Sequence, residues 1–152
     1  WTIAAIEAIR SARAEMNVPA GAQAPLVVVG PDAAASARLA ANDALIRRLA
    51  RLASVETAEA APAGAITLAV EGATLCLPLA ELIDVAAERA RLEKAVAKAE
   101  KEIKGFDAKL ANEKFLANAP EAVVEEQREK RAAAEADRAR LAAALERLAA
   151  AG

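Results

Sequence analysis

Residues 82–110, LIDVAAERARLEKAVAKAEKEIKGFDAKL, decide the fold class of this chain. Apolar residues recur along this stretch at alternating intervals of three and four, the pattern of a helix that packs along a single seam. The seam positions are Leu82, Val85, Arg89, Leu92, Val96, Ala99, Ile103, Phe106 and Leu110. Arg89 is the only charged residue among these positions. The stretch therefore predicts one long helix that needs a partner.

The same rhythm resumes after a short interruption and predicts a second helix. Pro120 suits the first turn of a helix. The weaker seam that follows consists of Val124, Gln127, Arg131, Ala134, Arg138, Leu141, Leu145 and Leu148. Each half spans about 30 residues, or roughly 43 Å at 1.5 Å per residue. We therefore expect residues 81–150 to form an antiparallel helical hairpin, a coiled coil that projects as an arm.

The residues before the hairpin predict a small α+β module at 21–80. PLVVVG at 25–30 is typical of a buried strand, and Asp32 can cap a helix that runs to residue 52. AITLAVEGATLCLPL at 65–79 predicts two strands that turn at Glu71 and Gly72, and Val55 can begin another short strand. A further helix is expected at 1–16. The predicted fold class is α+β: a strand–helix–hairpin module followed by a long antiparallel helical hairpin.

Composition excludes most enzyme classes for this chain. Its 152 residues include no His, no Tyr and one Cys, so most catalytic dyads, Cys/His metal sites and an intrachain disulfide are absent. No run of about 18 uncharged apolar residues and no signal-peptide pattern is present. We expect a cytoplasmic chain that has no contact with membranes, no catalytic residue and no metal ligand of its own.

Charge is segregated on the first helix of the hairpin. If Leu92 and Val96 face the partner helix, the opposite side carries Arg91, Lys94, Lys98, Lys101 and, next to them, Lys104. Such a stripe can bind phosphates although residues 81–150 contain 14 Lys and Arg against 15 Asp and Glu. The alternative is a solvated lysine face supported by local pairs such as Glu100 with Lys104. Charge alone favours this alternative.

The loop between the helices sets the predicted register of the hairpin. In the antiparallel register set by the loop, Glu102 comes near Lys130 and Asp107 comes near Arg128. Such exposed pairs would define the register more than they would stabilise the hairpin.

Three segments resemble, in order, the C-terminal region of the valyl-tRNA synthetases. They are IRSARAEMNVPAG at 9–21, LPLAELIDVAAERARLEK at 77–94 and KLANEKFLANAPEAVVEEQREK at 109–130. The resemblance implies that residues 1–20 close a helical anticodon-binding domain and that residues 81–150 are a tRNA-binding coiled-coil arm. It also implies that an upstream catalytic body joins valine to tRNA(Val) with ATP and Mg²⁺. We expect no cofactor in this fragment, which cannot aminoacylate alone.

The resemblance further implies that the arm packs on the outer corner of tRNA(Val). The candidate contacts are Arg91, Lys94, Lys98, Lys101, Lys104, Arg128 and Lys130, with Lys114 and Phe115 at the tip. Phe115 either plugs the end of the hairpin or stacks on an exposed base. Polar seam residues weaken homomeric coils, so a monomer is expected. A hypothesis from another class is a non-catalytic hairpin that mediates protein–protein association.

Overall fold

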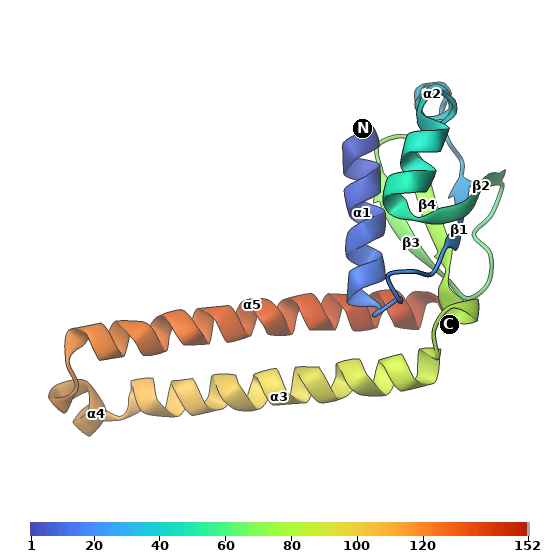
Figure 1. The fold of residues 1–152 in the computed structure, drawn as a ribbon. Helices are drawn as coiled ribbons and strands as arrows, with labels where there is room; N and C mark the ends of the chain where they lie inside the picture. Colours follow the sequence, from blue (N-terminus) through green and yellow to red (C-terminus); the bar gives the residue numbers. More distant parts are fainter. Residues whose placement is uncertain (152) are drawn as a thin grey trace. The chain divides into compact units, whose positions relative to one another are not determined.

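The computed structural model describes residues 1–151, apart from the side chains of Glu81 and Ala151. The chain folds as two compact units (Figure 1). The first contains Trp1–Glu88 and the last residues from Glu146 onward, and the second is Arg89–Leu145. A four-stranded sheet with helices precedes a helical hairpin, which confirms the predicted α+β class.

The sheet consists of β1 (Ala24–Val29), β2 (Leu52–Ala58), β3 (Ala65–Val70) and β4 (Ala73–Pro78). Its strand order is β2-β1-β4-β3. The strands β1 and β2 are parallel and are joined by a helical crossover, whereas β4 runs antiparallel to both of its neighbours. All four predicted strands are confirmed, and β2 is a full strand of 7 residues rather than a short one near Val55.

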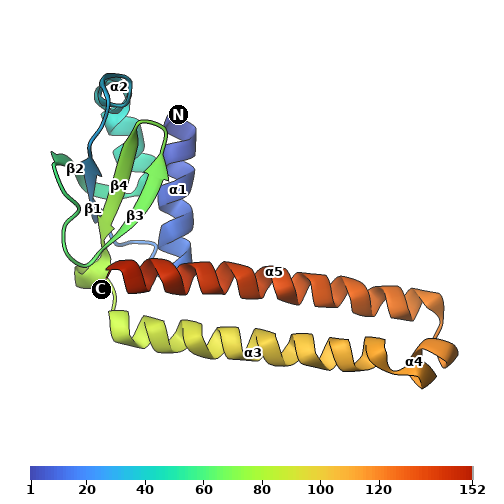
Figure 2. The same ribbon diagram turned by 180° about the vertical axis from the view of Figure 1, so that it is seen from behind.

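Two helices, α1 (Thr2–Glu15) and α2 (Ala33–Ala50), cover one face of this sheet (Figures 1 and 2). The largest fully buried side chains come from both layers and include Ile9, Met16, Leu26, Ile46, Leu75 and Leu77. Alternate residues of β1 are buried because successive side chains of a strand point to opposite faces. The core of the first unit therefore lies between the sheet and the two helices.

Asp32 joins the start of α2 to the β3–β4 turn. Its carboxylate accepts a hydrogen bond from the Ala35 backbone N–H at 2.7 Å, which confirms the predicted cap. Its own N–H donates to the Gly72 carbonyl at 2.8 Å. Gly72 has a φ of 77°, and a Cβ at this position would collide with the Asp32 carboxylate. Only glycine therefore fits this turn without strain.

The helix α1 is tied to the same unit at both of its ends. The Trp1 indole N–H donates to the Glu71 carbonyl at 2.6 Å, and the Arg13 guanidinium donates to the Arg51 carbonyl at 3.1 Å. The prediction that residues 1–20 close a helical anticodon-binding domain stays a prediction. In this structure α1 packs against α2 and β3.

The hairpin is built from α3 (Val85–Ala111), the short α4 (Glu113–Asn118) and α5 (Glu121–Ala151), after a 3₁₀ turn at Leu79–Glu81. The helix α3 begins at Val85, so Leu82 lies before the helix and its predicted seam position is wrong. The reason is Asp84, whose carboxylate accepts from the Ala87 N–H at 3.1 Å and caps the helix there. No helix in the described part of the chain is long and apolar enough to cross a membrane.

Replacement of Gly72 by alanine is predicted to destabilise the first unit by about 2–3 kcal/mol, because backbone strain at positive φ adds to the collision with Asp32. The matched control is Gly30→Ala, since Gly30 has a φ of 57° and nothing within 4 Å of the added Cβ. Urea unfolding followed by circular dichroism measures both variants. Equal losses of stability in the two variants would contradict the role assigned to the Asp32 contact.

Candidate nucleic-acid interface

The seam between α3 and α5 determines which side chains of the hairpin face the partner helix and which face away from it. Its buried members within Arg89–Leu145 include Leu92, Ala99, Val124 and Ala134. The predicted place of Arg89 in the seam is wrong, because Arg89 is exposed whereas Glu88 is 7% exposed. Glu88 lies four residues before Leu92, and residues i and i+4 share a helix face. At this end of α3 the buried side of the helix therefore carries Glu88, and not Arg89 as the heptad pattern predicted.

Two ion pairs join the helices of the hairpin. Arg131 Nε donates to the Asp107 carboxylate, and Arg138 Nε donates to Glu100 Oε1 at 3.2 Å. The two pairs lie seven residues apart on each helix, so they define one register. Both acidic partners also shift the Arg131 pKa upward, since Asp107 and Glu135 stabilise its charged form.

The predicted pairs Glu102–Lys130 and Asp107–Arg128 are therefore wrong. Lys130 instead pairs with Glu126 at 2.9 Å and Arg128 pairs with Glu125 at 3.4 Å, both within α5. The cause is α4, which occupies six residues between the long helices. The chain reverses after α4, at Ala119 and Pro120, rather than at the centre of the connecting segment. Consequently, Asp107 faces Arg131, about one helical turn further along α5 than its predicted partner Arg128.

Four lysines lie on the side of α3 that faces away from the seam. Lys94, Lys98, Lys101 and Lys104 are all exposed. At 100° per residue, Lys94 and Lys101 point almost directly away from Leu92 and Ala99, whereas Lys98 lies about 100–120° around the helix from them. None of the four forms an ion pair with another residue in the described part of the chain. We call these four residues the lysine face of α3.

The carboxylate that was expected to neutralise this face is directed elsewhere. Glu100 pairs with Arg138 across the hairpin, so the local pair Glu100–Lys104 does not form. Arg91 is exposed like the lysines but interacts with another residue. Lys109 is exposed and lies on the same side of α3, closer to the tip, but is not among the predicted contacts. The helical spacing from Lys98 and Lys101 could have identified it.

The tip of the hairpin is formed by α4. The Asn112 side chain caps this helix by accepting from the Lys114 and Phe115 backbone N–H groups at 3.0 and 3.2 Å. Lys114 is exposed and Phe115 is half-buried. Leu116 is 41% exposed. The apolar surface at the tip therefore comes from Leu116 more than from Phe115.

The outer side of α5 near the tip has the opposite charge. Residues 121–130 contain Glu121, Glu125, Glu126 and Glu129 against Arg128 and Lys130. Both basic residues pair with glutamates of the same helix, and the hydrogen bond and charge of Lys130 lower the pKa of Glu126. Gln127 Oε1 is buried and has no hydrogen-bond partner among the described residues. The hairpin is thus basic on the outside of α3 and acidic on the outside of α5 near the tip.

No cluster of three or more His, Cys, Asp or Glu side chains that could hold a metal ion occurs in the residues the structure describes.

Comparison with known proteins relates the hairpin and the whole chain to one family. Residues 84–149 match the family model described as the valyl tRNA synthetase tRNA binding arm. The valine–tRNA ligase of Agrobacterium fabrum is 50% identical over 152 residues, which is 100% of this chain and 16% of that protein. The corresponding proteins of Rhodopseudomonas palustris and Ruegeria pomeroyi are both 51% identical, over 97% and 98% of this chain. The chain spans 15–16% of the length of these relatives.

A double-mutant cycle tests the register of the hairpin. We predict that Glu100→Gln and Arg138→Gln show a coupling of a few tenths of a kcal/mol, as exposed ion pairs do. Glu100→Gln and Lys104→Gln form the control cycle, in which the coupling is predicted to be smaller. The free energy of unfolding of each variant in low salt provides the measurement. Stronger coupling of Glu100 to Lys104 than to Arg138 would refute the observed register.

Proposed function

Because this chain belongs to the valyl-tRNA synthetase family and its residues 84–149 match the tRNA-binding arm of that family, we propose that its helical hairpin binds tRNA through the lysine face of α3. The observation that carries this proposal is the set of exposed lysines without carboxylate partners at positions 94, 98, 101 and 104. Phosphate groups of RNA can supply the missing negative charge.

The distribution of charge favours binding of RNA on the α3 side of the hairpin. The glutamates on the outside of α5 repel a phosphate backbone, whereas the lysine face of α3 attracts it. The lysine face extends over about 15 Å from Lys94 to Lys104, and Lys109 lengthens it to about 22 Å at 1.5 Å per residue. Lys114 continues the positive charge at the tip. An RNA that lies along α3 can therefore meet several cations in succession.

The remaining candidate contacts have a secondary place in the proposal. Arg128 and Lys130 must exchange Glu125 and Glu126 for phosphates before they can contribute, so each adds less than an unpaired lysine. Arg91 already interacts with another residue. Phe115 is half-buried, so stacking on a base would require the tip to open.

We infer that the hairpin positions tRNA and does not identify it. Lysine contacts with phosphates hold an RNA in place but carry no sequence information, so preference for tRNA(Val) must come from shape or from the rest of the synthetase. The outer corner of tRNA(Val) is the proposed docking site. In this proposal aminoacylation with valine, ATP and Mg²⁺ takes place in the cytoplasm on the synthetase body, outside this chain. The chain itself contributes binding.

We predict that changing Lys94, Lys98 and Lys101 together to Glu weakens tRNA binding by at least tenfold near 0.1 M salt. Loss of about three phosphate contacts would also reduce the slope of log affinity against log salt by about 2 to 3. The seam should stay intact because none of the three lysines lies in it. Fluorescence anisotropy with labelled tRNA across a salt series measures affinity, and circular dichroism reports helicity.

The matched control replaces the same three lysines by Arg, which keeps the charge and should leave affinity within about threefold. An Arg128→Glu, Lys130→Glu variant tests the outer side of α5 and should have a smaller effect than the Lys→Glu triple variant. If the folded triple Glu variant binds tRNA with the affinity and salt slope of the unaltered chain, the lysine face is only solvated surface.

The chain is predicted to be a monomer at micromolar concentration. Asp107 and Glu100 of α3 satisfy Arg131 and Arg138 of α5 within one hairpin, and a homomeric coil would have to break these pairs or bury them. Sedimentation equilibrium without RNA tests this prediction. A stable dimer would favour the competing hypothesis that the hairpin mediates protein association.

A further inference from the structure

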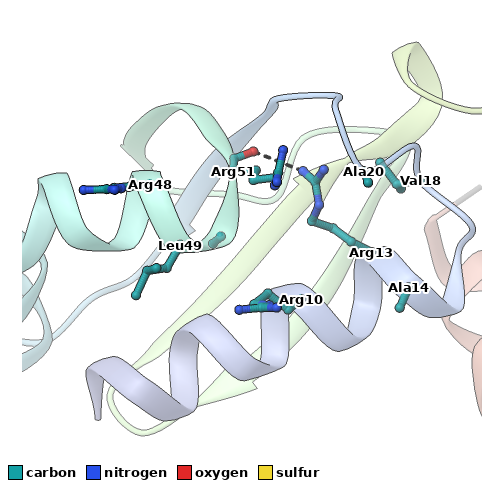
Figure 3. Close-up of a pocket in the computed structure, with 9 residues that line it drawn as sticks. Arg10, Arg13, Ala14, Val18, Ala20, Arg48, Leu49 and Arg51 are labelled. Atoms are coloured by element: carbon teal, nitrogen blue, oxygen red, sulfur yellow. Dashed lines mark hydrogen bonds between the residues drawn. The ribbon is translucent and has the colours of Figure 1, made fainter.

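A pocket of about 380 Å³ lies in the first unit, between α1, the loop after it and the last turn of α2. Four arginines line it: Arg10 and Arg13 from α1, and Arg48 and Arg51 from the end of α2 (Figure 3). Its nine lining residues include no Asp or Glu. Four like charges around one pocket repel each other, and a bound anion would offset this repulsion.

Arg13 is the buried member of this group. Its side chain is 6% exposed and donates to the backbone carbonyls of Arg51 at 3.1 Å and Ala22 at 2.5 Å, with a longer bond to Pro19 at 3.4 Å. These acceptors are neutral, so they orient the guanidinium without cancelling its charge. Burial and the nearby charge of Arg51 lower the Arg13 pKa.

The other three arginines of the pocket also lack acidic partners. Arg10, Arg48 and Arg51 are exposed and form no ion pair in the part of the chain that the structure describes. Glu7 lines an adjoining pocket with Arg10 but is not paired with it. All four arginines of the pocket are therefore without a carboxylate.

Arginines of the same unit outside the pocket behave differently. Arg47 pairs with Asp43 at 2.9 Å, Arg38 lies 4.0 Å from Glu71, and Arg147 pairs with Glu15. A favourable interaction with the negative end of α2 can account for Arg48, which lies in its last turn. This interaction does not account for Arg10 and Arg13, which belong to another helix. The shortage of carboxylates is thus specific to the pocket.

We propose that this pocket binds a phosphate group of the RNA backbone and so provides a second contact outside the hairpin. The inference rests on the proposed function, because tRNA supplies the phosphate. Guanidinium groups bind phosphate oxygens through paired, charge-assisted hydrogen bonds, and Arg13 is already oriented by its carbonyl partners. Arg13 also covers the Arg51 carbonyl, which would otherwise repel an anion at the end of α2.

RNA suits this pocket better than a free nucleotide does. None of the lining residues is aromatic, and none is a glycine of the kind that lets a backbone loop wrap around a triphosphate. Leu49 and Val18 supply apolar wall instead. One phosphate of a continuous strand needs only the arginine cluster, because contacts elsewhere on the RNA hold the strand in place.

Chemical footprinting of this chain locates the contact directly. Bound tRNA is predicted to protect Arg10 and Arg48 from phenylglyoxal several-fold, as measured by mass spectrometry, and to leave Arg38 and Arg47 unchanged. Acetylation of lysines in the same samples reports on the lysine face of α3. Protected lysines with unprotected pocket arginines would overturn this inference and leave the proposed function standing. Protected arginines with unprotected lysines would support the pocket and count against the hairpin.

Two adjacent substitutions on α2 form a matched pair. Arg48→Gln is predicted to weaken tRNA binding three- to tenfold and to reduce the salt slope by about 1, the effect of one lost phosphate contact. Arg47→Gln removes the same charge outside the pocket and should change affinity less than twofold. Equal effects of the two substitutions would overturn the inference. So would protection of Arg10 and Arg48 by ATP or inorganic phosphate, but not by tRNA, at equal phosphate concentration.

Discussion

Burial of the seam between α3 and α5 is the constraint on which the candidate interface depends. Because Leu92 and Ala99 face the partner helix, the residues at 94 and 101 must face away from it. The pairs across the hairpin reinforce this arrangement, since Glu100 and Asp107 are turned toward arginines of α5. The contact between Glu100 and Arg138 that joins the two helices therefore also removes Glu100 as an ion-pair partner for Lys104.

Elements with strong local signals could be predicted from the sequence. Asp32 caps α2 through a bond to a residue three positions away, and the β3–β4 turn rests on Gly72 and its neighbours. The register of the hairpin and the boundaries of its helices depend on contacts between residues far apart in the sequence. Local sequence patterns do not reveal such contacts. The helix α4 is only six residues long, yet its presence moves the reversal of the chain and changes which residue faces Asp107.

The lysine face of α3 and the arginine pocket also differ in whether the sequence alone could predict them. The lysine face could be derived because helical periodicity places residues of one segment on one side. The comparisons confirm the resemblance of the chain to the valyl-tRNA synthetases. The arginine pocket could not be derived. It combines Arg10 and Arg13 with Arg48 and Arg51, which lie more than 30 residues away and meet only after α1 packs against α2.

The buried Gln127 side-chain oxygen, which has no hydrogen-bond partner among the described residues, is expected to lower the local stability of the hairpin near its tip. A buried polar atom without a hydrogen bond costs free energy, and Phe106 and Leu110, in the part of α3 that leads to the tip, are only half-buried. We expect amide hydrogens to exchange fastest in the last turns before the tip, which would open locally while the remainder of the hairpin stays closed. An arm of this kind can adjust its end to a curved partner without losing its register.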